Sequence, residues 1–145
     1  MLHVLEHSLL GYRYMSSHAE SVLVVEDDES LAQVIALALR AEGFEAETAH
    51  DGVDGCASYF NHPTDWVVTD IQMPELDGIG MMQCIRTINP HVRAIYMSGA
   101  IDEYRVLLER ETKEFAARVL RKPFSRINLL EQLTSEENAG SAEKR

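Results

Sequence analysis

The stretch "SVLVVEDDES", residues 21–30, places an unbroken apolar run, Val22 to Val25, directly before a cluster of acids. A short run that is rich in β-branched residues is typical of a strand buried on both faces, as in a parallel sheet. Parallel strands need a crossover connection, which is usually a helix. The stretch therefore predicts an α/β fold and directs attention to the segment that follows it.

A helix is expected directly after the acids. Ser30 and Gln33 form a candidate capping box at its start. Gly43 stands where a left-handed residue commonly ends a helix. The apolar stripe of this helix, at the spacing i, i+3, i+4, i+7, i+8, consists of Leu31, Val34, Ile35, Ala38 and Leu39.

The same alternation of strand and helix continues along the chain. It predicts a doubly wound α/β domain in which five parallel strands form one sheet with five helices on its two faces. Further strands are expected at 45–49, 65–69, 92–97 and 118–121. Further helices are expected at 51–60, from Asp77-Gly78 to about 88 with an apolar stripe of Met81, Cys84, Ile85 and Ile88, at 102–114 and at 126–133.

Length and composition narrow the class of protein. The 145 residues suit one core, with 46% apolar and 26% charged residues. A formal net charge of −11 argues against direct DNA binding, which needs clustered bases. No apolar run approaches the length of a membrane span, so we expect no membrane partner and a cytoplasmic location. Cys56 and Cys84 lack a CxxC spacing and are interpreted as small apolar residues in a reducing compartment.

The domain is expected to cover residues 21–134. Residues 1–20 are expected to be a poorly ordered extension, and Met15 is a candidate for the true start. Residues 135–145 are polar and small and are expected to be a disordered tail. The chain is therefore either a stand-alone domain or a fragment of a longer protein.

Polar residues stand where several predicted strands end, and the carboxyl ends of parallel strands share one edge of a sheet. Carboxylates that lie close together repel each other unless a cation joins them, and a set of oxygen ligands suits Mg²⁺. A carboxylate can also attack phosphorus, with a lysine and a hydroxyl to neutralise the transferred oxygens. The residues are Glu26 to Glu29 after the first strand, Asp70 after the third, Ser98 after the fourth and Lys122 after the fifth.

Each of these residues has a simpler explanation when taken alone. Glu26 to Glu29 could be acids favoured by a helix N-terminus, and Asp70 could be a turn residue. A serine before a glycine and an exposed lysine are both ordinary. The set in this order carries more weight than any member. Neither GxxxxGK[ST] nor GxGxxG occurs in the chain, which argues against a nucleotide cradle.

Four motifs occur in order along the chain: "LVVEDDE" at 23–29, "VVTDIQMPELDG" at 67–78, "MSGA" at 97–100 and "RKPF" at 121–124. With them, residues 21–134 resemble a response-regulator receiver domain of the CheY-like family, in its stand-alone, single-domain form. The resemblance implies a flavodoxin-like sheet with the strand order 2-1-3-4-5. It also implies signalling in a two-component phosphorelay.

The resemblance implies a role for each matching residue. Asp70 would accept a phosphoryl group from a sensor histidine kinase or a histidine phosphotransfer protein. Mg²⁺ would be held by Asp70 and Asp27, by Glu26 through water, and by the backbone carbonyl of Gln72. Lys122 would contact the phosphoryl oxygens, aimed by a cis bond to the proline that follows it.

Signalling is where the chain departs from the family. Ser98 would swing toward the phosphoryl group and bias a surface that docks an unknown downstream protein. The family often has an aromatic switch three residues before the lysine, but this chain has Val119, which is stiff and has no ring. Gln72 and Ala100 occupy positions that tune dephosphorylation in the family. Basic residues are expected around the docking surface, which would then suit an acidic partner: Arg105, Arg110, Arg118, Arg121 and Arg126.

Two other functions are alternatives to that of a receiver. A pseudo-receiver would share the fold but act as a phosphorylation-independent interaction module, which Val119 favours slightly and the intact Asp70 and Lys122 disfavour. A Mg²⁺-dependent aspartyl phosphatase generally needs an acid two residues after the nucleophile, and Gln72 cannot serve. We therefore expect no enzyme activity beyond the protein's own phosphorylation and dephosphorylation.

Overall fold

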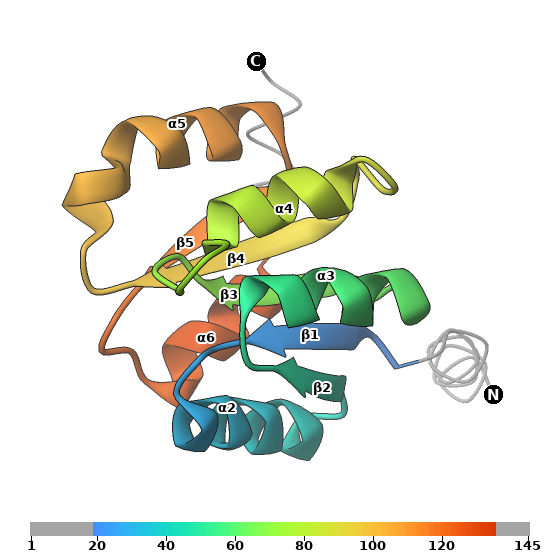
Figure 1. Ribbon diagram of the computed structural model, residues 1–145. Helices are drawn as coiled ribbons and strands as arrows, with labels where there is room; N and C mark the ends of the chain where they lie inside the picture. The colour runs from blue at the N-terminus through green and yellow to red at the C-terminus, as the bar shows by residue number, and fades with distance from the viewer. Residues whose placement is uncertain (1–18, 136–145) are drawn as a thin grey trace, which may run out of the picture.

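The computed structural model describes residues 19–135, which fold around one five-stranded parallel sheet of order β2-β1-β3-β4-β5 (Figure 1). This confirms the predicted fold class and strand order. The predictions for residues 1–18 and 136–145 lie outside the described residues. The strands are β1 Ser21–Val25, β2 Glu45–Ala49, β3 Trp66–Asp70, β4 Arg93–Ser98 and β5 Ala117–Arg121.

Helices cover both faces of the sheet. In Figure 1, α3, α4 and α5 lie over one face, and α2 and α6 lie over the other. The segment expected as one helix at 102–114 is instead a short 3₁₀ helix, η1, followed by α5. The helices are α2 Glu29–Ala41, α3 Gly52–Asn61, α4 Gly78–Arg86, η1 Ile101–Tyr104, α5 Arg105–Glu114 and α6 Arg126–Thr134.

The apolar run of β1 feeds two separate cores. Val22 and Val24 belong to the core under α2 and α6, and Leu23 and Val25 belong to the core under α3 and α4. Successive side chains of a strand point to opposite faces, so a strand covered on both sides must be apolar throughout. This is why the apolar residues of β1 form a continuous run and do not alternate with polar residues.

Two local predictions about α2 are wrong. The helix begins one residue before Ser30, and its N-cap is Asp28, whose side chain accepts a hydrogen bond from the Leu31 N–H. Ser30 and Gln33 therefore lie inside the helix and form no capping box. The buried stripe runs through Ala32, Ile35, Ala36 and Leu39. Val34 points to solvent with 62% of its surface exposed, as does Ile88 after α4, with 57% exposed.

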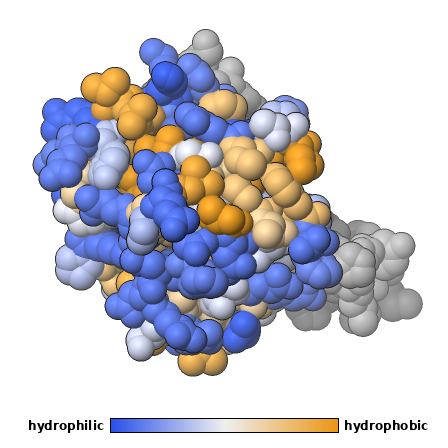
Figure 2. Space-filling view, in the orientation of Figure 1, coloured by the Kyte–Doolittle hydropathy of each residue, from blue (hydrophilic) through white to orange (hydrophobic). Residues whose placement is uncertain are grey.

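The outer surfaces of the helices carry scattered apolar side chains. Figure 2 shows apolar residues gathered on this face of the molecule, over the part where Figure 1 places α3 and α4. Val53, Phe60 and Ile88 are the large exposed apolar residues of that part of the chain. Within residues 19–135, no helix has both the length and the apolar character needed to cross a membrane.

Candidate functional site

The ends of the three central strands bring the candidate residues to one edge of the sheet. Val25 of β1 pairs with Thr69 of β3, so Glu26 and Asp70, the next residue of each chain segment, lie side by side. Asp70 pairs in turn with Met97 of β4, which precedes Ser98. The register therefore places these side chains together, although they come from distant parts of the sequence.

Three carboxylates form a cluster at this edge. One oxygen each of Glu26, Asp27 and Asp70 lies within 4.8 Å of the others. Glu26 is buried with 1% of its surface exposed, Asp70 has 8% exposed, and Asp27 is exposed to solvent. The donor set contains only oxygen atoms and one of its members faces solvent, which fits a hard divalent cation that keeps several waters.

Lys122 joins two of these carboxylates. Its Nζ lies 2.7 Å from Glu26 Oε1 and 3.2 Å from Asp70 Oδ2. Burial alone, the largest single effect, would lower the pKa of Lys122, but the hydrogen bonds and charges of the two carboxylates together raise it above its usual value. The ammonium therefore stays charged, and one positive charge faces three carboxylates. The remaining excess of negative charge suits Mg²⁺.

Glu26 is the most buried member of the cluster. Burial raises the pKa of its carboxyl, and the nearby charge of Asp70 adds to the rise. The hydrogen bonds from Lys122 and from the Asp28 N–H, the latter at 3.1 Å, lower this pKa without cancelling the effect of burial. A bound cation would favour the charged carboxylate still further.

The backbone beyond Asp70 is packed tightly against the start of α4. A Cβ on Gly78 would lie 2.2 Å from the Asp70 carbonyl oxygen, so no larger residue fits there. The Gly78 N–H donates to the Ile71 carbonyl at 2.9 Å, and the Thr69 hydroxyl donates to the Asp70 carbonyl at 2.8 Å. These contacts fix the backbone of Asp70 while its carboxylate faces the open edge.

Ser98 is buried at the end of β4, with 1% of its surface exposed. Its Oγ accepts a hydrogen bond from the Ala100 N–H at 2.9 Å, so within the described chain the side chain is turned to its own loop. The Lys122 N–H donates to the Ser98 carbonyl at 2.9 Å and ties β5 to this loop. The Lys122–Pro123 bond is cis, as expected.

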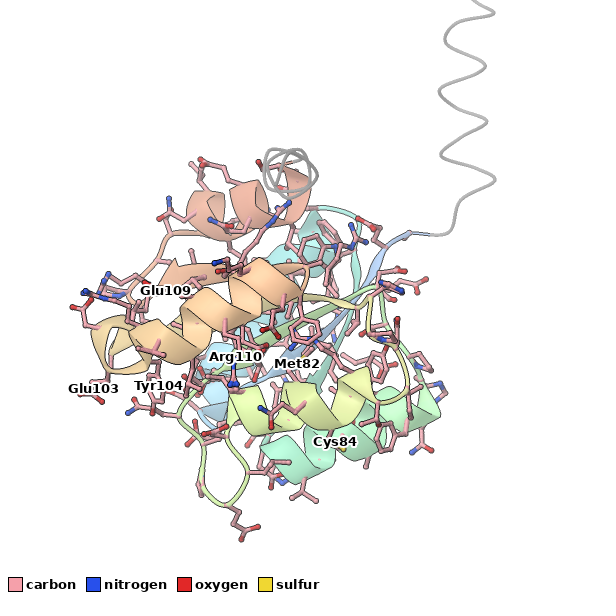
Figure 3. All side chains as sticks on the ribbon, turned by 90° about the horizontal axis from the view of Figure 1, so that it is seen from above. Met82, Cys84, Glu103, Tyr104, Glu109 and Arg110 are labelled. Carbon is pink, nitrogen blue, oxygen red and sulfur yellow. The ribbon has the colours of Figure 1, made fainter. Side chains whose placement is uncertain are left out.

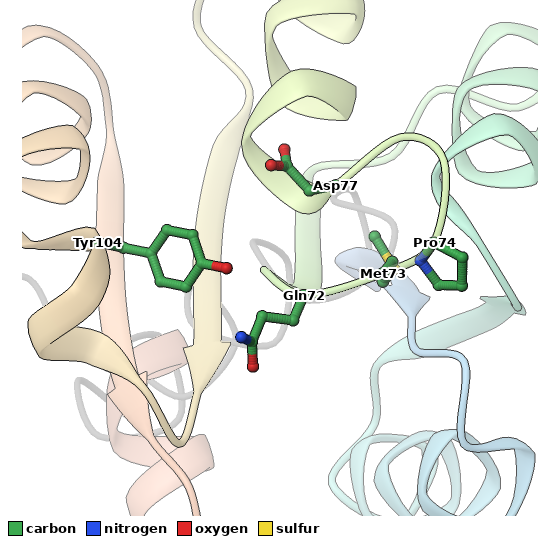
Figure 4. A pocket seen from close by; sticks show the side chains of 5 residues that line it. All are labelled: Gln72, Met73, Pro74, Asp77 and Tyr104. Carbon is green, nitrogen blue, oxygen red and sulfur yellow. The ribbon is translucent and has the colours of Figure 1, made fainter.

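Gln72 lies in the loop that follows Asp70. Its side chain lines a pocket of about 400 Å³ together with Met73, Pro74, Asp77 and Tyr104 (Figure 4). The role of its backbone carbonyl as a metal ligand stays a prediction. Tyr104 was missed by the sequence reasoning, because nothing in the sequence around η1 links it to a loop that ends more than twenty residues earlier.

Two further residues are engaged elsewhere in the domain. Asp28, adjacent to the cluster, caps α2 through the Leu31 N–H at 3.1 Å. Arg118, expected on a basic docking surface, donates instead to the backbone carbonyls of Gln132 and Ser135, and its guanidinium lies 5.4 Å from the Trp66 ring centroid. Its charge is engaged within the domain, which weakens the case for an acidic partner.

The chain is similar to a known protein family and to several of its members. The family model described as "Response regulator receiver domain" matches residues 22–134. The chemotaxis protein CheY of Treponema pallidum is 33% identical over 117 residues, which cover 79% of this chain and 80% of that protein. The transcriptional regulatory protein TrcR of Mycobacterium tuberculosis is 30% identical over 78 residues, which cover 54% of this chain.

The relatives differ in length from this chain. The matched segments span 34% and 30% of the lengths of two M. tuberculosis regulators, TcrX and TrcR. A solved structure, the receiver domain of the sensor histidine kinase PA1611 from Pseudomonas aeruginosa PAO1, superposes with a TM-score of 0.71 at 25% identity. The match covers 84% of this chain and 98% of that one, and that structure has a magnesium ion coordinated in its active-site cleft.

Proposed function

This chain belongs to the response regulator receiver domain family, and on that premise we propose that Asp70 accepts a phosphoryl group in a two-component phosphorelay. The donor is a sensor histidine kinase or a histidine phosphotransfer protein. The observation that carries the proposal is the position of Lys122, whose ammonium contacts both Asp70 and Glu26 at the open edge of the sheet.

The chemistry follows from the positions of the side chains. An Asp70 carboxylate oxygen attacks the phosphorus of a phosphohistidine, the P–N bond breaks, and an acyl phosphate forms while the imidazole leaves and takes up a proton. Lys122 is already within reach of Asp70 and neutralises the oxygens that gain charge. Asp27, Asp70 and the Gln72 carbonyl, with Glu26 through water, would hold Mg²⁺, which would supply the rest of that neutralisation when bound.

The phosphoryl group then acts through Ser98. The Ser98 hydroxyl turns from the Ala100 N–H toward the new phosphoryl oxygens, and this changes the conformation of the loop between β4 and α5. The altered surface docks a downstream protein, and the protein acts in the cytoplasm without binding DNA or a membrane itself. Its only chemistry is its own phosphorylation and dephosphorylation.

A small phosphodonor tests the proposal. We expect acetyl phosphate with Mg²⁺ to add one phosphoryl group to the protein, seen by intact mass as an acid-stable, base-labile adduct. Asp70→Asn should remain unmodified. Asp77→Asn is the matched control, because its side chain caps α4 through the Gly80 N–H and asparagine can do the same.

The alternative is a pseudo-receiver that binds its partner without phosphorylation. An unmodified wild-type protein, in a preparation that binds Mg²⁺ and is folded by circular dichroism, would reject the phosphoacceptor and favour this alternative. An adduct that persists in Asp70→Asn would place the phosphoryl group elsewhere.

A further inference from the structure

Val119 and Tyr104 pack against the same hydrophobic core. Val119 of β5 pairs with Tyr96 of β4, and its side chain packs against the core under α3, α4 and α5. Ile101 and Tyr104 of η1 pack against this same core. The chain thus brings a tyrosine to this side of the sheet from a different element.

Tyr104 also forms one wall of the pocket next to the site. The opposite wall is the loop that begins two residues after Asp70, with Gln72, Met73 and Asp77. In Figure 4 the Tyr104 hydroxyl points across the pocket toward Gln72 and Asp77. A small displacement of η1 toward this loop, which begins two residues after Asp70, would therefore narrow the pocket.

A short chain of hydrogen bonds connects Ser98 to Glu103 of η1, the residue directly before Tyr104. The Ser98 Oγ accepts from the Ala100 N–H at 2.9 Å, and the Ala100 carbonyl accepts from the Glu103 N–H at 3.1 Å. The η1 helix has no side-chain cap and no buried residue. A Cβ on Gly99 would meet no atom within 4 Å, so the side next to this glycine is open.

The helix that follows is held far more firmly. Glu111 of α5 is buried and accepts hydrogen bonds from Arg86 of α4 and from the Tyr96 hydroxyl. Figure 3 shows α5 lying beside α4, with Tyr104 in the turn that leads into α5. The contacts of Glu111 thus anchor α5, whereas the segment 99–104, which carries Tyr104, has no side-chain cap and no buried residue in η1.

We propose that Tyr104 is a positioning residue whose ring moves when Asp70 is phosphorylated and then shields the acyl phosphate from water. It would take the place of the aromatic switch that the family often has at the position of Val119. This rests on the proposed function of Asp70. When the Ser98 hydroxyl turns to the phosphoryl group, it releases the Ala100 N–H, and η1 moves toward the loop after Asp70. The Tyr104 ring then closes the pocket and slows the entry of water to the acyl phosphate.

The test follows Tyr104 by ¹⁹F NMR in protein labelled with 3-fluorotyrosine. The resonance that is missing in Tyr104→Phe identifies this residue. We expect it to shift when Mg²⁺ and beryllofluoride, a phosphoryl mimic, are added to the wild type, and to stay unchanged in Asp70→Asn. Ser98→Ala should abolish the shift, because the hydroxyl that couples the site to η1 is gone.

A second measurement follows the lifetime of the acyl phosphate by intact mass. Tyr104→Ala should shorten its half-life by about threefold or more because water enters more freely, while Tyr104→Phe keeps the ring and should stay close to the wild type. The matched control, Val106→Ala, changes a side chain on α5 that is 79% exposed and should leave the half-life unchanged.

The outcomes separate this inference from the proposed function. If no adduct forms at all, the phosphoacceptor role of Asp70 fails, and the role of Tyr104 fails with it. If the adduct forms but the Tyr104 resonance does not move, or if Tyr104→Ala and Val106→Ala have equal half-lives, only the role of Tyr104 is overturned.

Discussion

The Nζ of Lys122 lies closer to Glu26 than to Asp70, at 2.7 Å against 3.2 Å. Lys122 is therefore shared between a buried carboxylate and Asp70, the proposed acceptor of the phosphoryl group. The same ammonium competes with any cation that binds the cluster, because both neutralise the same oxygens.

Replacing Lys122 should strengthen metal binding while it weakens phosphorylation. In Lys122→Met we expect Mg²⁺ affinity to rise about tenfold, since a neighbouring positive charge is removed from the site. Isothermal titration calorimetry measures this change. Lys113→Met removes the same charge from the exposed surface of α5 and should leave the affinity unchanged. Equal affinities in both variants and the wild type would contradict the shared role of Lys122.

The neighbouring acids Asp27 and Asp28 should respond differently to substitution. Mg²⁺ at a hundred times its Kd should stabilise the folded protein by about 2.7 kcal/mol, because it binds only the native state. Asp27→Asn should lose most of that gain in thermal unfolding. Asp28→Asn should keep it, because asparagine still caps α2 at the Leu31 N–H. A loss in Asp28→Asn equal to that in Asp27→Asn would make Asp28 a ligand.

Two glycines next to functional residues should differ sharply in how well they tolerate substitution by alanine. Gly78→Ala would place a Cβ 2.2 Å from the Asp70 carbonyl oxygen, and the shift needed should lower the free energy of unfolding by about 1–3 kcal/mol. In Gly99→Ala the new Cβ meets no atom within 4 Å, and the free energy of unfolding should change by less than about 0.5 kcal/mol. Urea unfolding compares the two, and equal stabilities would show that the approach of α4 to Asp70 can relax.

The buried ion pair between Arg86 and Glu111 should contribute more to the free energy of unfolding than any exposed charge on α5. Glu111→Gln leaves the Arg86 guanidinium buried without a charged partner, and we expect it to cost about 3 kcal/mol or more. Glu109→Gln, on the exposed side of the same helix, should cost less than about 0.5 kcal/mol. Chemical unfolding tests this, and similar losses in both variants would mean that Arg86 finds another partner.

The sequence predicted the features that depend on local pattern. The doubly covered β1 and the polar residues at the strand ends follow from short runs and from the geometry of parallel sheets. The cap of α2 was missed because Asp28 and Ser30 are both good capping residues two positions apart, and pattern alone does not choose between them.

Long-range partners account for the other differences. Arg118 was expected at the surface, but its carbonyl acceptors lie 14 and 17 residues further along the chain. Arg86 and Glu111 are 25 residues apart, and neither stands out in its own segment. Tyr104 joins the pocket only because β4 brings η1 beside the loop after Asp70. Contacts of this kind depend on the assembled fold and leave no periodic signal.

The placement of the site at strand ends separates chemistry from recognition. Glu26, Asp70, Ser98 and Lys122 leave the sheet at its edge, whereas the exposed apolar residues of the helices, such as Leu37 of α2 and Ile127 of α6, point away from it. We therefore expect that the outward faces of the helices can be exchanged for those of another receiver without disturbing the carboxylate cluster. If Asp70 is phosphorylated by acetyl phosphate as proposed, such a chimera should still be phosphorylated and should differ only in the protein that it binds.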